Sequence, residues 1–152
     1  MRANDMRQVA SAWLRTHVPD DRSILVEHAA FDMLHRHGAL LFPLGSAGCV
    51  DMRQALGAHP SFQNVDHKRS GRAIVDIGHV DPARLPSCAA DVMVFSHYAR
   101  YQAEAFRFQP QLAIYRRLMR NGRLVERIEP IPGMRGGPVI DIIATRPDAV
   151  GR

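Results

Sequence analysis

The sequence predicts an α/β fold, with a single mixed sheet of about six strands and helices packed on it. Three observations favour this class. The chain opens with an amphipathic helical pattern that leads through a turn into a short apolar run. Short apolar runs then alternate with helical patterns along the rest of the chain. The last two runs are joined by a connection rich in proline and glycine, which favours a C-terminal antiparallel strand pair.

Length and composition set the domain count. The chain has 152 residues, of which 46% are hydrophobic, which is enough for one domain with its own core. We expect a single domain over residues 5–145 and a frayed tail over residues 146–152. No apolar run approaches the roughly 18 residues that a membrane span requires. We therefore expect neither a membrane span nor a targeting signal in this chain.

Helices are predicted from apolar periodicity. The clearest is capped by Asp5 and carries apolar residues at Met6, Val9, Ala10, Trp13 and Leu14. Further helices are expected over 29–35, 50–56, 98–106 and 110–120, with a short helical turn over 81–85. Gly38 is placed to end the second helix in the left-handed conformation.

Strands are expected over 23–27, 39–42, 73–77, 92–95, 124–128 and 139–143. The four consecutive apolar residues of 92–95 are typical of a strand buried on both faces. A polar and aromatic segment follows it, and ligands gather at the carboxyl ends of strands in open α/β sheets. The loop that begins at Ser96 is therefore the first place to look for function. A long loop is expected over 59–71.

Basic residues outnumber acidic ones, which gives a formal net charge of +5. Five arginines gather at Arg116, Arg117, Arg120, Arg123 and Arg127. Such a group can meet the phosphates of nucleic acid or of an anionic membrane surface. We favour a solvated helix face that complements the negative end of the helix dipole, because no aromatic residues are interleaved with the arginines. A nucleic-acid partner is accordingly the least favoured.

The two cysteines, Cys49 and Cys88, form no Cys-x-x-Cys pair and exclude a cysteine-only zinc site. A disulfide and two buried thiols both remain open. Among the eight histidines, His35 and His37 with His28 or Glu27 suggest metal ligands. If His35 and His37 end a helix, their side chains point about 200° apart. We therefore expect no metal site and no cofactor.

The segment after the 92–95 strand also suggests a hydrolase. Ser96 would be the nucleophile, with His97 or His28 as base and Asp76 or Asp91 as the residue that orients the base. The Gly-x-Ser-x-Gly frame of a nucleophile elbow is absent. We favour a structural interpretation, in which Ser96 caps the following helix while Tyr98 and Tyr101 pack beneath it.

Glu27 ends an apolar strand, where a carboxylate beside Arg100 or Arg135 would form a buried pair that organises the sheet edge. Arg135 lies in a glycine-rich loop, and Gly136 would allow an anion to approach the backbone closely. This loop is a second candidate binding edge. The candidate binding residues are Glu27, His28, Ser96, Tyr98, Arg100, Tyr101, Arg135 and Gly136; we assign no catalytic residue.

Several stretches, in a fixed order, resemble a known family. They are Asp5-Met6-Arg7 with Trp13-Leu14, Ile24 to Glu27, Asp91 to Tyr101, Tyr115 with Leu118, and Pro130 with Gly137 to Ile140. Together they resemble the soluble extracytoplasmic C-terminal domain of bacterial membrane glycosyltransferases of the dolichyl-phosphate-mannose protein mannosyltransferase type. The resemblance covers residues 5–145. The sequence departs from the pattern at Val92, where a tyrosine is common, and at Asp141-Ile142, which replaces Ile-Tyr.

The resemblance implies a location and a role. In that family the catalytic acidic residue belongs to the membrane portion, which this chain lacks, so we expect a non-catalytic accessory domain on the extracytoplasmic (periplasmic) side. Implied partners are the membrane portion of a glycosyltransferase, a lipid-linked sugar or a glycan. The alternative is a small independent hydrolase or metal-dependent enzyme that uses Ser96, His97 and His28.

Overall fold

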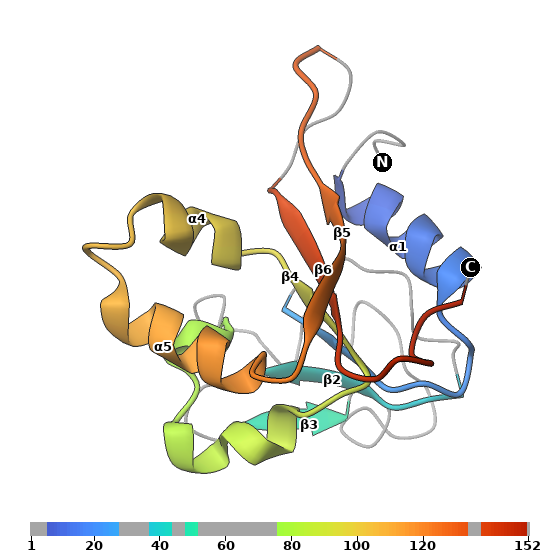
Figure 1. The fold of residues 1–152 in the computed structure, drawn as a ribbon, viewed down its shortest axis with the longest axis horizontal. Coiled ribbons are helices and arrows are strands. Elements are labelled where there is room, and N and C mark those ends of the chain that lie inside the picture. The colour runs from blue at the N-terminus through green and yellow to red at the C-terminus, as the bar shows by residue number, and fades with distance from the viewer. Residues whose placement is uncertain (1–5, 28–36, 44–47, 52–75, 134–137, 152) are drawn as a thin grey trace, which may run out of the picture.

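The computed structural model describes residues 6–27, 37–43, 48–51, 76–133 and 138–151. These residues form one mixed sheet of six strands with helices packed against it, as predicted (Figure 1). The strands are β1 (Ile24–Val26), β2 (Leu40–Pro43), β3 (Cys49–Asp51), β4 (Val92–Phe95), β5 (Arg123–Ile128) and β6 (Ile140–Ala144). Their order across the sheet is β3-β2-β1-β4-β6-β5.

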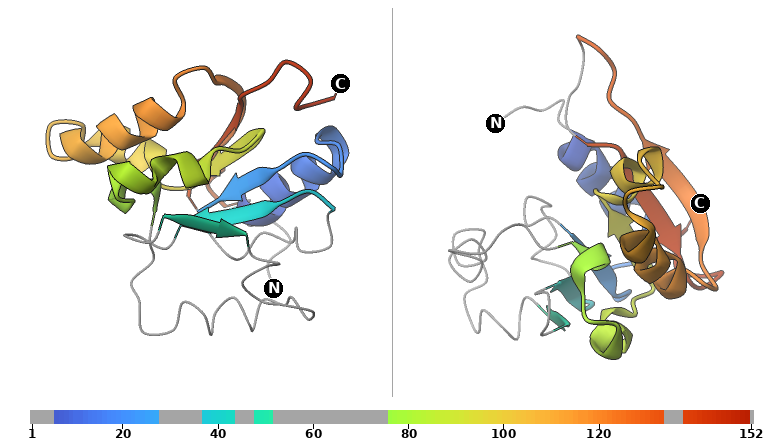
Figure 2. Two further views of the ribbon diagram at one scale, coloured as in Figure 1. Left: turned by 90° about the horizontal axis from the view of Figure 1, so that it is seen from below. Right: turned by 90° about the vertical axis from the view of Figure 1, so that its left-hand side faces the viewer.

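The sheet is parallel at its centre and antiparallel toward both edges. β1 pairs in parallel with β2 on one side and with β4 on the other. β3 pairs antiparallel with β2, beside which it lies in the left view of Figure 2. β6 pairs antiparallel with β4 and with β5, so the predicted C-terminal antiparallel pair is confirmed. From β1 the chain continues to β2 and β3 on one side and then crosses over to β4 on the other side, which makes the gap between β1 and β4 a topological switch point.

One face of the sheet packs against the first helix, α1 (Met6–His17). The buried residues Met6, Ala10 and Leu14 follow the predicted helical spacing and contact alternate strand residues such as Ile24 and Val26. This period-two arrangement explains why strands that are apolar throughout still have two distinct faces. In Figure 1, α1 lies on one side of the strands, and α4 and α5 lie on the other.

The opposite face is covered by four helical segments. They are η2 (Ile77–His79), η3 (Pro82–Cys88), α4 (Tyr98–Ala103) and α5 (Gln109–Leu118). Phe95 of β4 contacts Tyr115 of α5 edge to face, with ring centroids 5.0 Å apart. Tyr101 of α4 is 1% exposed and packs against the ring of Phe108. The two tyrosines bring hydroxyl groups into an otherwise apolar layer, where each needs a partner.

Two element predictions were wrong within the described residues. Residues 50 and 51 belong to the strand β3 and not to a helix, because they pair with the backbone of β2, which would otherwise lie at an open edge. Ile77 begins the 3-10 helix η2 and does not end a strand. Asp76 precedes η2 as its N-cap residue. The helix predicted over 29–35, residues 52–56 of the next predicted helix and residues 73–75 of the predicted strand lie outside the described residues. Six strands are nevertheless present, since β3 takes the place of the predicted 73–77 strand.

Gly38 does not adopt the predicted left-handed conformation. Its role is close approach, because a Cβ at this position would lie 2.2 Å from the carbonyl oxygen of Arg22. The amide of Gly38 donates to Asp20 O at 2.8 Å, which ties the entry of β2 to the turn before β1. A side chain larger than hydrogen would force these two backbone segments apart.

The C-terminal residues up to 151 are not frayed. Ala149 is completely buried in the core beneath α1. The amide of Gly151 donates to His17 O at the end of α1, and Arg22 lies 3.2 Å from Asp148. One apolar side chain and these polar contacts therefore hold the tail against the start of the fold.

None of the helices in the described ranges is long and apolar enough to cross a bilayer.

Candidate functional site

The switch point between β1 and β4 is occupied by the carboxylate of Glu27, which follows β1 directly. Glu27 is completely buried. One oxygen, Oε1, accepts from the backbone amides of Ser96 at 2.8 Å and His97 at 3.2 Å. The other, Oε2, accepts from the backbone amide of Ile77 at 2.8 Å and from the hydroxyl of Tyr115. With at least four donors around it, this acceptor-only group joins β1 to the starts of η2 and α4 and to α5.

A second buried carboxylate belongs to Asp76. This residue directly precedes Ile77, whose backbone amide binds Glu27. Asp76 is 4% exposed. Its Oδ2 accepts from the hydroxyl of Tyr101 at 2.5 Å, and its Oδ1 lies 2.8 Å from Nδ1 of His79. The side chain of His79 is 55% exposed, so this contact opens to solvent on one side. We call Glu27, Asp76, Tyr101 and Tyr115 the carboxylate–tyrosine network.

Both tyrosines in the network act as hydrogen-bond donors. Burial, the hydrogen bond to Asp76 and the charge of Asp76 raise the pKa of Tyr101 above its usual range. Burial and the charges of Glu27 and Asp76 raise the pKa of Tyr115 in the same way. Neither phenol loses its proton near neutral pH, so each hydroxyl satisfies a carboxylate oxygen. The network therefore holds the structure together and offers no easily released proton.

His97 lies at the edge of the network and is partly accessible to solvent. Its Nδ1 is 3.7 Å from Oε1 of Glu27 and 3.3 Å from Oγ of Ser96. Burial alone would lower the pKa of His97, but the hydrogen bond with Glu27 and the negative charges of Glu27 and Asp76 together raise it above the ordinary value. His97 is thus a group at this edge whose charge can change with pH.

The Ser96, His97 and Glu27 side chains do not form a catalytic triad. A triad histidine uses one ring nitrogen toward the serine and the other toward the carboxylate. Here the same nitrogen, Nδ1, faces both Ser96 and Glu27. Ser96 is also only 5% exposed. The remaining hydrolase candidates do not complete the set, because Asp91 binds Ser23 N at the other end of β4 and His28 lies outside the described residues.

The expected capping role of Ser96 is wrong. His97 occupies the N-cap position of α4, and no side chain caps that helix. Ser96 Oγ contacts the imidazole of His97 instead. The carboxylate of Glu27 binds the amides of Ser96 and His97, the two residues that precede α4.

The predicted binding residues separate into two groups. Glu27, Ser96 and Tyr101 are buried and work inside the fold. Tyr98 is half-buried and Arg100 is exposed, so these two side chains reach the surface. The guanidinium of Arg100 lies 5.2 Å from the ring centroid of Tyr101, and Arg100 therefore does not pair with Glu27 as one alternative required. His28, Arg135 and Gly136 lie outside the described residues.

Two members of the network were not recognised as such from the sequence. Asp76 was considered only as a catalytic partner, and Tyr115 was named only among the residues that carry the family resemblance. The available signal was the single acidic residue within the apolar stretch Ala73 to Ile77. A carboxylate in such a stretch requires buried donors.

A second polar group lies at the same edge of the sheet. Asp141 of β6 is 1% exposed, and its Oδ1 accepts from Nε of Arg127 at 2.5 Å. Arg127 also donates to Oε1 of Gln102 on α4 at 3.3 Å, which links the antiparallel pair to that helix. The hydrogen bond and the charge of Asp141 raise the pKa of Arg127 further, although burial opposes this. Arg127 thus belongs to a structural pair and not to a free basic surface.

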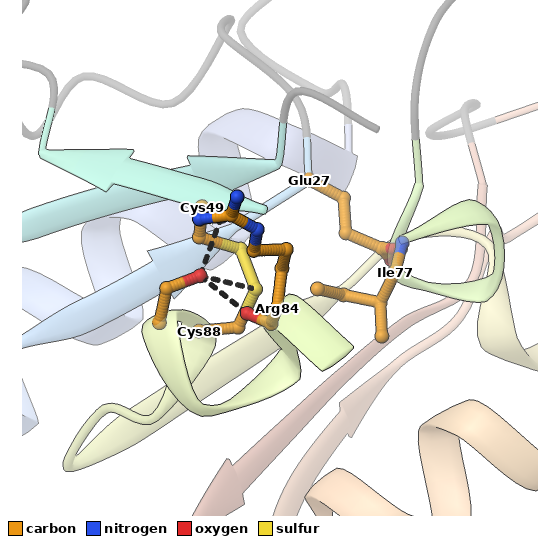
Figure 3. Close-up of a disulfide and its surroundings, with 6 residues drawn as sticks. Glu27, Cys49, Ile77, Arg84 and Cys88 are labelled. Atoms are coloured by element: carbon orange, nitrogen blue, oxygen red, sulfur yellow. Dashed lines mark hydrogen bonds between the residues drawn. A yellow bond between two sulfur atoms is a disulfide. The ribbon is translucent and has the colours of Figure 1, made fainter. Parts of the chain in front are cut away.

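A disulfide lies beside the carboxylate–tyrosine network. Cys49 of β3 and Cys88 of η3 are joined, with Cα atoms 5.0 Å apart, and Figure 3 shows the bond next to Glu27 and Ile77. Ser87 Oγ accepts from Cys49 N at 2.9 Å and donates to Arg84 O at 2.6 Å. The bond connects the edge strand to the helical layer and resolves the choice that the sequence left open between a disulfide and two thiols.

No cluster of three or more potential metal ligands occurs within the described ranges. His37 contacts Asp20, while His28 and His35 lie outside those ranges. Comparison with family models, curated proteins and solved structures finds no match to this chain. The structure itself describes an α/β domain whose switch point is filled by the carboxylate of Glu27.

Proposed function

We propose that this chain is a non-catalytic binding domain related to the soluble extracytoplasmic domain of lipid-phosphate-sugar-dependent membrane glycosyltransferases. The observation that supports this proposal is the meeting of separate stretches that carry the resemblance. Glu27, the start of α4 at Ser96 and His97, and Tyr115 are far apart in the sequence but form one hydrogen-bonded network. Residue types shared with that family are thus the ones that build this sheet edge.

The role proposed is binding and not bond breaking. Buried tyrosine hydroxyls and backbone amides satisfy both carboxylates, and Ser96 lacks a correctly placed base. The side chains left at the surface are those of Tyr98 and Arg100. An aromatic ring suits the face of a sugar, and a guanidinium suits a phosphate. The proposed ligand is a glycan or a lipid-linked sugar, at a surface that would face the membrane portion of a transferase.

The proposed location is the extracytoplasmic side of a membrane. The disulfide between Cys49 and Cys88 supports it, because such bonds persist in oxidising compartments and are rare in the reducing cytosol. Measuring the thiol content of the protein isolated from its native cells, under alkylating conditions, tests this directly. Two free thiols in the native protein would contradict the proposed location.

Binding of nanodiscs that contain a polyprenyl-phosphate mannose tests the proposed function. We expect Arg100→Gln and Tyr98→Ala each to weaken binding about tenfold, as the loss of a charge-assisted contact or a stacking surface would. Arg107→Gln is the matched control, because Arg107 is exposed, lies in the segment between α4 and α5 and pairs with Glu104. The absence of binding, or equal losses in all three variants, would refute the proposal.

The second candidate function is hydrolysis, which the 3.3 Å contact between Ser96 Oγ and His97 Nδ1 favours. A turnover assay with small aryl esters separates it from binding. We expect no turnover above that of Ser96→Ala. Turnover that disappears in both Ser96→Ala and His97→Gln would replace the binding proposal with the hydrolase.

A further inference from the structure

A cavity of about 420 Å³ lies at the opposite end of β4 from the carboxylate–tyrosine network. Ala89, just before the strand, and Met93, within it, line one wall. The end of α5 supplies the other wall through Arg117 and Leu118, and Arg120 follows that helix. The cavity therefore combines an apolar base with cationic side chains.

The side chains of the two arginines that line this cavity are without a partner in the part of the chain that the structure describes. Among the residues that the structure describes, neither Arg117 nor Arg120 has a hydrogen bond or an ion pair. No acidic residue occurs in the sequence between Glu104 and Glu126. Asp91, which follows Ala90 in the wall, already accepts from Ser23 N and lies 3.4 Å from Arg146. The field inside the cavity is therefore positive and attracts an anion.

The wall facing the arginines is held in place. Thr145 Oγ1 donates to Ala90 O at 2.7 Å, and Thr145 N donates to Asp91 O at 3.0 Å. These bonds fix the segment before β4 to the end of β6. A preformed wall costs no ordering free energy on binding.

We infer that this cavity binds a phosphomonoester attached to an apolar group. Arg117, in the last turn of α5, and Arg120, which follows that helix, both line the cavity. Two guanidinium groups offer more donors than a carboxylate can accept and suit the three oxygens of a phosphate. The apolar group would lie against Met93 and Leu118. This inference does not depend on the proposed function, since the two sites lie at opposite ends of β4.

The competing role of these arginines is to neutralise the carbonyl groups at the end of α5. Arg116 separates the two roles. It lies in the same last turn, is exposed, and has no ion pair within the described ranges, but it does not line the cavity. A purely electrostatic patch would use Arg116 as much as its neighbours, whereas a binding cavity would not.

Calorimetric titration of the whole chain with phenyl phosphate tests the inference. We expect Arg117→Gln and Arg120→Gln each to weaken binding about tenfold, as the loss of a charge-assisted hydrogen bond would, and Arg116→Gln to leave it unchanged. Ala89→Phe, which fills the cavity without altering charge, should also weaken binding. Inorganic phosphate should bind more weakly than phenyl phosphate because it has no apolar group.

Vesicles of phosphatidylcholine and phosphatidate distinguish a lipid headgroup from a free phosphate ester. Binding to these vesicles alone, with the same dependence on Arg117 and Arg120, supports the cavity and identifies a lipid as the source of the phosphate. Equal losses in Arg116→Gln, no effect of Ala89→Phe, or no binding of either probe would overturn the inference. All four substituted positions are exposed, so unchanged thermal unfolding midpoints should accompany every variant.

Discussion

The carboxylate of Glu27 accepts a hydrogen bond from the hydroxyl of Tyr115, which lies 88 positions further along the chain. This contact joins the end of the central strand β1 to the helix α5 at the point where open α/β sheets usually bind ligands. An internal side chain thus takes the place of an external anion. The consequence is that the switch point itself is filled by a side chain of the protein.

We predict that Glu27→Ala destabilises the fold by about 3 kcal/mol or more, because it leaves several buried donors without an acceptor. Tyr115→Phe removes a single donor and should cost about 1 to 2 kcal/mol. Urea unfolding of the three proteins measures both differences. A loss for Glu27→Ala no larger than that for Tyr115→Phe would show that the amides of Ser96, His97 and Ile77 do not depend on this carboxylate.

The disulfide should contribute about 4 kcal/mol, as expected for a bond that closes a loop of 39 residues. Replacing both Cys49 and Cys88 by serine should lower the free energy of unfolding by about that amount. Reductant should destabilise the original protein equally and have no effect on the double variant. If reductant changes both proteins alike, its effect has another cause.

Two glycines with positive φ make a matched pair for testing close packing. Gly48 has φ +79°, and a Cβ there would lie 2.5 Å from Ser87 Oγ and 2.9 Å from Arg84 Cβ. Gly133 has φ +76°, with no atom within 4 Å of its Cβ position. Gly133→Ala should cost about 1 kcal/mol from backbone strain, and Gly48→Ala should cost clearly more. Equal decreases in the thermal unfolding temperature of the two variants would mean that Ser87 and Arg84 of η3 move aside at little cost in free energy.

His97 should make stability depend on pH. Its pKa is raised in the folded state, so its contribution is fully present below the unfolded pKa near 6.5 and is lost as pH rises through the folded pKa. The difference in unfolding free energy between the original protein and His97→Gln should therefore decline from about pH 6 upward. Denaturant titrations at several pH values measure it. A difference that grows with pH would reverse the assigned direction.

Local signals predicted much of this fold. The spacing of Met6, Ala10 and Leu14 identified α1 and its buried face, and the run from Val92 to Phe95 matched β4. Such patterns succeed because periodicity depends on neighbours within a few residues. β3 was not recognised, because its strand conformation depends on pairing with β2 and on the disulfide at Cys49.

The sequence alone determined the class of fold, the faces of its helices and the importance of the segment after β4. Only the tertiary structure decided what the polar residues of that segment do. Ser96 and Tyr101 lie in a chain segment whose sequence is compatible with a catalytic loop, a helix cap or a structural network. The choice rests on Glu27 and Asp76, which approach them from other strands and loops. The role of a buried polar group depends on its hydrogen-bond partner. When that partner lies far away in the sequence, no local sequence pattern identifies it.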